Sequence, residues 1–318
     1  MTTQQNSERL EHPLPKYRDL ATRIYRDVVR RRTTVRVHQA KWAQDTSFEL
    51  SFLLGLYRSG TTPLRYSLGM HPSLATPPET DFLAPFLESL RDPRGLRGLE
   101  SMGFDPQHVE SCYRQAALYF YENYAASVDP GVQMLLDKSP LYVSYADLIP
   151  QLFPSSRFII LIRHPFGQIG SLTRHGSMEP DVPGFPVDYV SLSAASAMYW
   201  AEGTERLLDL AESTGSIVVR YEDLCEQPET VLRQLTDGLE LPWDPAVMAY
   251  DGSTQDRGME GAKALAYKTF ESWMADPMRG WSDEAAAELS NEWRRVAQVA
   301  ERCGYSEKAA GEWKWTIG

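Results

Sequence analysis

A turn rich in glycine and hydroxyl side chains follows the first strongly apolar run of the chain. The apolar run occupies residues 51–57, and a helical pattern follows the turn. The turn itself consists of Arg58-Ser59-Gly60-Thr61-Thr62. With Gly55 it has the spacing of the phosphate-binding motif G-x-x-x-x-G-K-[ST], except that Thr61 stands at the lysine position. Glycine, the helix start and the hydroxyls all favour contact with an anion, so the segment predicts a phosphate-binding loop.

The charge that a lysine would supply is predicted to come from Arg58. A guanidinium is always charged and can bind two oxygens at once, so it can hold a phosphate without magnesium. A metal-dependent phosphotransferase would also need an acidic residue after a neighbouring strand. The apolar run 157–162 leads into Arg163 instead. The sequence therefore predicts no bound metal and makes a kinase-like phosphotransferase the least favoured alternative.

Arg163 begins a second anion-binding pattern. Ser171 follows it about two helical turns into the stretch that starts after His164-Pro165. An arginine at the end of a buried strand is costly without an anionic partner, and ligands of open α/β sheets bind at such strand ends. Two anion sites on neighbouring strand ends predict a nucleotide with phosphates at two positions. His164 and His175 flank this site and are interpreted as structural or anion-contacting residues.

Short apolar runs that alternate with helical patterns define the elements that must position these residues. Strands are expected at residues 51–57, 133–137, 157–162 and 216–219. Helices are expected at residues 61–71, 80–90, about 107–126, 141–152, 164–175 and 188–213. A last helix is expected from Ser282 to Gly304, with one stripe formed by Leu289, Trp293, Val296, Ala300 and Cys303. The alternation predicts an α/β fold, a P-loop-like three-layer α/β/α domain with a central parallel sheet.

Charge is distributed unevenly along the chain. The net charge is −11, but residues 1–45 hold ten Lys/Arg and five Asp/Glu, so the remaining residues carry −16. We predict a leader with a basic amphipathic helix at 1–50 and a single domain at 51–318. The acidic body disfavours nucleic-acid binding. The basic segment, whose helix is expected at 16–30, is either solvated or a docking face for an acidic partner such as a carrier protein.

Other features of the sequence narrow the class of protein. No stretch approaches the roughly 18 to 20 apolar residues of a transmembrane helix, and the start lacks a secretory signal, so we expect a cytoplasmic protein without a membrane span. Cys112, Cys225 and Cys303 form no C-x-x-C pair and predict neither a disulfide framework nor a zinc site. We expect all three to be buried. The assembly state is left open, with a homodimer as one alternative.

Three segments resemble the sulfotransferases that use 3′-phosphoadenosine-5′-phosphosulfate (PAPS) and release 3′-phosphoadenosine-5′-phosphate (PAP). They are residues 57–80, 136–172 and 218–228, in the expected order. The resemblance implies that the loop from Arg58 to Thr62 binds the 5′-phosphosulfate. It also implies that Arg163 and Ser171 bind the 3′-phosphate and that Tyr221 contacts the nucleotide. A core tyrosine at a strand end is the alternative for Tyr221.

The arginine in the loop and the acidic residue after two prolines most resemble the tyrosylprotein branch of this family and related bacterial enzymes. By this resemblance, Glu79 is the general base and Lys138 assists the leaving group. The small-molecule branch has a histidine two residues after such a lysine, where this chain has Pro140. The alternatives are a helix-start carboxylate for Glu79 and a surface lysine paired with Asp137 for Lys138.

Sulfuryl transfer suits these residues chemically. An acceptor hydroxyl must lose its proton as it attacks sulfur, and negative charge grows on the bridging phosphate oxygen as it leaves. Glu79 can take the proton, while Arg58 and Lys138 can counter the charge. We therefore predict a metal-independent, PAPS-dependent sulfotransferase. A non-catalytic nucleotide-binding module is the alternative from another functional class.

The acceptor is expected to be a small-molecule or carrier-bound hydroxyl whose identity the sequence leaves open. The segment PPETDFL resembles acyl-carrier-directed bacterial sulfotransferases, which adds a carrier-bound hydroxyacyl chain to the alternatives. For a third 3′-phosphate contact the chain offers only Arg257 or Arg279, and residues 251–281 are interpreted as a loop or lid. One helix carries aromatic residues that either line an acceptor pocket or belong to the core. They are Tyr113, Tyr119, Phe120, Tyr121 and Tyr124.

Overall fold

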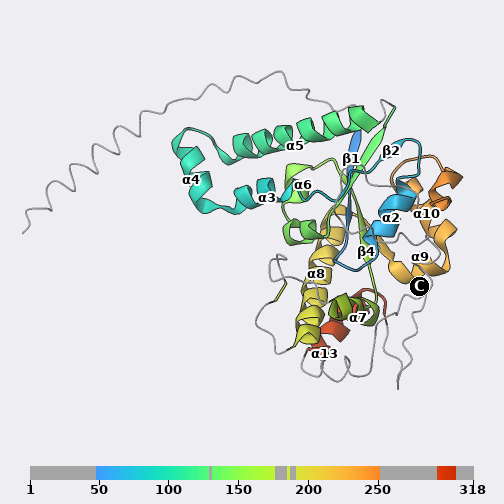
Figure 1. Ribbon diagram of the computed structural model, residues 1–318. Coiled ribbons are helices and arrows are strands. Elements are labelled where there is room, and N and C mark those ends of the chain that lie inside the picture. The colour runs from blue at the N-terminus through green and yellow to red at the C-terminus, as the bar shows by residue number, and fades with distance from the viewer. Residues whose placement is uncertain (1–47, 129–130, 176–184, 187–190, 251–291, 306–318) are drawn as a thin grey trace, which may run out of the picture.

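Five parallel strands form the central sheet of the computed structural model, which describes residues 48–128, 131–175, 185–186, 191–250 and 292–305 (Figure 1). The strands are β1 (Glu49–Leu54), β2 (Leu74–Ala75), β3 (Met134–Lys138), β4 (Arg157–Ile162) and β5 (Ile217–Arg220). Their order across the sheet is β2-β3-β1-β4-β5, and every neighbouring pair is parallel. The predicted α/β fold with a parallel sheet is thereby confirmed.

Helices connect these strands and cover both faces of the sheet (Figure 1). The α-helices are α2 (Thr61–Leu68), α3 (Ala84–Arg91), α4 (Pro93–Ser101), α5 (Pro106–Val128), α6 (Ile149–Leu152), α7 (Pro165–His175), α8 (Leu192–Thr214), α9 (Tyr221–Glu226), α10 (Pro228–Gly238) and α13 (Trp293–Arg302). Two 3-10 helices are η1 (Pro140–Tyr145) and η2 (Pro245–Met248). Figure 1 shows α3, α4 and α5 extending away from the sheet.

Successive side chains of β1 enter two different hydrophobic cores. Phe52 and Leu54 pack in a cluster that includes residues of α5 and α8. Leu53 packs in the other cluster, with residues of α2 and α10. Alternate residues of a strand point to opposite faces of its sheet, so a strand covered on both faces is apolar throughout. This explains why β1 could be recognised as a continuous apolar run.

The helices differ from the prediction where proline and capping residues intervene. The predicted helix at 141–152 is divided into η1 and α6. Pro150 lies in the first turn of α6, where a residue without an N–H donor is tolerated, so the helix restarts there. Helices α4, α9 and α10 were not predicted. The start of α4 carries a clear sequence marker, because the Asp92 side chain accepts hydrogen bonds from the backbone N–H groups of Arg94 and Gly95.

The terminal predictions are tested only in part. The helix at 16–30 and the predicted start at Ser282 lie outside the described residues, so the division of the chain at residue 50 stays a prediction. Within α13, Val296 and Ala300 are buried, as the predicted stripe requires. None of the helices in the described ranges combines the length and apolar character needed to cross a membrane.

The prediction of three buried cysteines is wrong. Cys112 is exposed, and Cys225 and Cys303 are only partly buried. Cys112 lies on α5, which buries few of its residues and packs through one face. The burial of a single small side chain depends on which face of a helix it occupies, and composition alone does not determine this.

His164 caps the helix that follows β4. Its Nδ1 accepts a hydrogen bond from the backbone N–H of Phe166 at 3.3 Å, near the first turn of α7. The ring is buried and meets the rings of Phe166 and Tyr305 edge to face. Burial, together with the positive charge of Arg163, lowers the pKa of His164 to about 3. The structural interpretation of His164 is therefore supported, since a neutral ring keeps Nδ1 as an acceptor. The side chain of His175 lies outside the described residues.

This burial predicts a pH-dependent part of the stability. The unfolded histidine binds a proton below its usual pKa of 6.5, whereas the folded one does so only near 3. Stability is therefore lost as the pH falls through this window, by about 2 kcal/mol between about pH 7 and about pH 5. Asparagine can also cap the helix but does not titrate, so His164→Asn should lack this part of the loss. Urea unfolding of both proteins at several pH values measures the difference, and parallel pH profiles would contradict the expectation.

Candidate active site

The carboxyl ends of four strands bring the predicted site residues to one edge of the sheet. β1 leads into the loop at residues 55–60, and β3 ends at Lys138. β4 precedes Arg163 directly, and β5 precedes Tyr221. Because the strands are parallel, all these ends lie on the same side, where open α/β sheets bind their ligands.

The loop after β1 is tightly turned. Arg58 and Gly60 have φ angles of 68° and 102°, a conformation that glycine adopts easily and arginine rarely. A Cβ atom on Gly60 would lie 2.4 Å from the Tyr221 ring. Only glycine therefore allows the loop to approach this ring so closely. The Ser59 hydroxyl is buried and has no hydrogen-bond partner among the described residues, so it is available to a ligand in the loop.

The two predicted anion sites form one connected cluster. Arg58 Nε donates a hydrogen bond to Ser171 Oγ at 3.1 Å. Arg163 Nη1 donates to the carbonyl oxygen of Arg58 at 3.0 Å. The Arg163 guanidinium also lies 4.8 Å from the centre of the Tyr221 ring, a favourable cation–π contact. Tyr221 is itself buried in the hydrophobic core, so it is both a core tyrosine and a neighbour of the cluster.

Lys138 and Glu79 meet at the mouth of the loop. The Lys138 side chain is 1% exposed and forms a salt bridge with Glu79, whose side chain is 30% exposed. Lys138 Nζ also donates to Thr62 Oγ1 at 3.2 Å, which ties it to the first turn of α2. Burial lowers the pKa of Lys138, and the charge of Glu79 opposes this change. A partly exposed carboxylate therefore faces a buried cation beside the predicted phosphate loop.

The alternative of a surface pair between Lys138 and Asp137 is wrong. Adjacent residues of β3 point to opposite faces of the sheet. The buried carboxylate of Asp137 accepts hydrogen bonds from the hydroxyls of Tyr121 and Tyr142, and burial raises its pKa. Lys138 is thus separated from its acidic neighbour and finds its partner in Glu79.

Two residues that the sequence analysis did not select hold the segment that carries Glu79. Arg65 of α2 is buried, and its Nη1 donates to the carbonyl oxygen of Pro77. Asp81 accepts a hydrogen bond from Ser139 Oγ and has a φ of 53°. The sequence could have indicated Asp81, because it is a second carboxylate only two residues after the predicted base Glu79. The only sequence signal for Arg65 was a charged residue among the apolar positions of the helix expected at 61–71.

Helices α7 and α8 fix the backbone on both sides of the cluster. The Tyr57 carbonyl accepts a hydrogen bond from Gln168 Nε2 at 2.8 Å, and its N–H donates to Tyr199 Oη at 3.5 Å. The carbonyl of Arg163 accepts a hydrogen bond from Trp200 Nε1 at 3.0 Å. The loop and the arginine at the end of β4 are therefore anchored through their main chains.

These residues fit a ligand with two anionic groups. The cluster offers guanidinium groups, hydroxyls, a buried ammonium group and the free N–H groups at the start of α2. No group of three His, Cys, Asp or Glu side chains suited to hold a metal ion occurs in the described ranges. Arg257, Arg279 and the rest of the predicted lid at 251–281 lie outside those ranges.

The aromatic residues of α5 were predicted either to belong to the core or to line an acceptor pocket, and they fall into a buried group and an exposed group. Tyr121 is buried, and the rings of Tyr113 and Tyr124 pack against the core. Tyr119 and Phe120 are about half exposed, and the Phe120 ring meets the edge of Phe82 with centroids 5.8 Å apart. The exposed ring of Phe120 therefore lies beside Phe82, a partly buried residue three positions after Glu79 in the chain.

The sequence of this protein is similar to a known protein family. Residues 51–245 match the model of the sulfotransferase family. The nodulation protein NoeE of Sinorhizobium fredii (strain NBRC 101917 / NGR234) is 29% identical over 263 residues, which cover 71% of this chain and 60% of NoeE. Protein-tyrosine sulfotransferase A of Caenorhabditis elegans is 22% identical over 267 residues, 81% of this chain and 67% of that protein. The chain thus matches about two thirds or less of the length of these relatives.

Solved structures share the fold. The sulfotransferase domain from the Synechococcus PCC 7002 olefin synthase is 26% identical, and the match covers 85% of this chain and 100% of that domain with a TM-score of 0.58. The sulfotransferase domain from the curacin biosynthetic pathway is 22% identical, with 82% and 99% coverage and a TM-score of 0.56. The latter similarity concerns the fold alone.

The match to the family includes the five strands of the described sheet and all the predicted site residues except Arg257 and Arg279. It begins in β1, contains the loop and Glu79, and continues through Lys138 and Arg163 to η2. It covers more than half of the chain, so this protein belongs to the sulfotransferase family.

Proposed function

We propose that the protein transfers a sulfuryl group from PAPS to an acceptor hydroxyl without a metal ion. The observation that carries the proposal is the pair formed by Glu79 and Lys138 beside the loop after β1. A base for the hydroxyl and a cation for the leaving group then lie together at an anion-binding loop.

The loop and the strand ends suit the two ends of such a donor. In this proposal, residues 58–62 hold the 5′-phosphosulfate through backbone N–H groups, the Ser59 hydroxyl and the Arg58 guanidinium. Arg163 and Ser171 hold the 3′-phosphate, and the Tyr221 ring stabilises the Arg163 guanidinium through the cation–π contact. The hydrogen bond between Arg58 and Ser171 gives these two anion sites a shared side chain.

The reaction is an in-line displacement at sulfur. The acceptor oxygen forms a bond to sulfur while the bond from sulfur to the bridging phosphate oxygen breaks. The proton of the hydroxyl passes to Glu79, which is exposed enough to face an acceptor. Lys138 and Arg58 stabilise the charge that remains on the phosphate oxygen. Because burial lowers the pKa of Lys138, this ammonium group is also a better proton donor to that oxygen than a surface lysine would be.

We infer that the acceptor is a small-molecule or carrier-bound hydroxyl from secondary metabolism. The similarity to the olefin synthase domain supports this, as do the exposed aromatic side chains of α5 beside Phe82, which suit an apolar acceptor. The basic segment at 1–45 suits an acidic carrier protein, and a cytoplasmic location fits such a substrate.

Replacing the proposed base tests the chemistry. Glu79→Gln keeps the size of the side chain but removes its ability to take a proton. We expect kcat to fall about 100-fold or more, while the Kd for PAP changes by less than about threefold. Transfer from labelled PAPS to a panel of free and carrier-bound hydroxyl compounds measures the rate, and calorimetry with PAP measures binding.

A matched carboxylate elsewhere controls for the loss of charge. Glu88→Gln alters an exposed residue of α3 that accepts a hydrogen bond from Tyr145, and it should leave the rate unchanged. Full activity of Glu79→Gln would remove Glu79 from the mechanism. A wild-type protein that binds PAP but transfers no label to any acceptor would favour the non-catalytic nucleotide-binding module.

A methyl group in the loop tests the donor site. In Gly60→Ala the new Cβ would collide with the Tyr221 ring at an unfavourable φ, so the loop must move away from β5. We expect the Kd for PAP to rise about tenfold or more. Gly98→Ala is the control, because a Cβ there meets nothing within 4 Å. Equal PAP affinity of Gly60→Ala and wild type would contradict the assigned loop.

A further inference from the structure

Tyr305 lies beyond the part of the chain that matches the family, yet it reaches the donor site. Its hydroxyl donates a hydrogen bond to Glu222 Oε2 at 2.6 Å. The other oxygen of Glu222 accepts from the backbone N–H of His164 at 3.0 Å. We propose that Tyr305 and Glu222 are positioning residues for the 3′-phosphate arm, the turn at Arg163 and His164. This inference rests on the proposed function, which assigns the 3′-phosphate to Arg163.

Glu222 is a carboxylate without access to solvent. Its side chain is fully buried, and burial raises its pKa. A buried carboxylate needs hydrogen-bond donors for its oxygens, and here two of the donors come from segments far apart in the chain. Loss of either donor would leave a polar oxygen in the core with one hydrogen bond fewer, which the structure can relieve only by moving the carboxylate or its remaining partner.

Glu222 is linked to Arg163 through its neighbours on both sides. His164, which it holds, is the next residue in the chain. Tyr221, which precedes Glu222, lies under the Arg163 guanidinium. Trp200 of α8 holds the Arg163 carbonyl from the other side. A shift of Glu222 is therefore passed to the backbone of Arg163 and to the ring beneath its charge.

The C-terminal turn of α13 directs Tyr305 toward Glu222. Gly304 has a φ of 77°, and the N–H of Tyr305 donates to the carbonyl of Ala300 at 2.9 Å. This closes the helix in a Schellman motif and turns the chain inward. The Gly304 carbonyl accepts a hydrogen bond from Arg220 Nη1, whose guanidinium is paired with Asp223 of α9.

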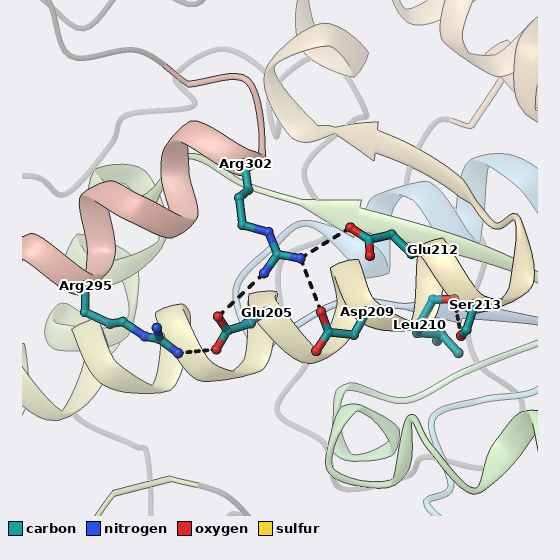
Figure 2. Close-up of polar contacts among 7 residues, drawn as sticks. All are labelled: Glu205, Asp209, Leu210, Glu212, Ser213, Arg295 and Arg302. Atoms are coloured by element: carbon teal, nitrogen blue, oxygen red, sulfur yellow. Dashed lines mark hydrogen bonds and ion pairs between the residues drawn. The ribbon is translucent and has the colours of Figure 1, made fainter.

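Ion pairs dock α13 on α8. Figure 2 shows Arg295 and Arg302 of α13 directed at the acidic side chains Glu205, Asp209 and Glu212 of α8. Each exposed pair contributes little alone. The buried apolar side chains of α13 and the contacts of Tyr305 must therefore supply most of the attachment. Tyr305 is 2% exposed.

Removal of one hydroxyl tests the inference. Tyr305→Phe keeps the ring but removes the hydroxyl that donates to Glu222 Oε2. We expect the Kd for PAP to rise about tenfold, while kcat at saturating PAPS stays within about twofold, because Glu79 and Lys138 lie outside these contacts. Adenosine 5′-monophosphate, which lacks the 3′-phosphate, should bind both proteins equally within about twofold. Calorimetry and initial rates provide these values.

A matched variant controls for the loss of a buried tyrosine hydroxyl. The ring of Tyr145 is also buried, and its hydroxyl donates to the exposed Glu88. Tyr145→Phe should leave PAP affinity unchanged. Unchanged PAP affinity in a folded Tyr305→Phe protein would overturn the inference, and so would an equal loss of affinity for both nucleotides, which indicates general damage.

Variants of Glu222 decide the question if Tyr305→Phe fails to fold. In Glu222→Gln the amide oxygen can accept from His164 while the amide nitrogen donates to the Tyr305 oxygen, so PAP affinity should stay within about threefold. Glu222→Ala removes both contacts and should weaken PAP binding about tenfold or more. Similar affinities of these two variants would overturn the inference. A wild-type protein that binds PAP no better than adenosine 5′-monophosphate would refute the proposed 3′-phosphate site itself, and the inference with it.

Discussion

The burial of positive charge at one edge of the sheet is the constraint on which the rest of the site depends. Lys138 exposes 1% of its surface and Arg163 exposes 8%. Such groups are costly to remove from water unless each has a partner nearby. Glu79 serves Lys138, whereas the Arg58 carbonyl and the Tyr221 ring serve Arg163. These partners fix where the loop, the segment before α3 and the end of β5 must lie.

The parts of the fold that depend on local pattern could be predicted from the sequence. Strands β1, β3 and β4 were visible as apolar runs because each is covered on both faces. The loop was visible because only certain residue types can approach an anion. The parallel order of the strands places Arg58, Lys138 and Arg163 at one edge without further information. The two-residue strand β2 and the interruption between η1 and α6 have no comparable pattern.

The contacts that complete the site could not be predicted, because they join residues far apart in the chain. Nothing in the sequence near Glu222 indicates that Tyr305 is its partner, and nothing near Lys138 indicates that it pairs with Glu79 and not with Asp137.

A cationic site is compatible with the negative net charge of the protein. At physiological ionic strength, exposed charges more than roughly 8 to 10 Å away are largely screened, so the nearest side chains dominate the potential at the strand ends.

Helix α8 contacts the backbone before the loop and the end of β4. Tyr199 contacts the backbone before the loop, Trp200 contacts the arm at the end of β4, and the backbone at Gly203 leaves no room for a Cβ beside Leu56. The two proposed anion sites are therefore held by the same helix. In the proposed function, a site of this kind selects ligands by the distance between their charged ends as well as by their charge. A compact polyanion of equal charge would fill one end and leave the other unsatisfied.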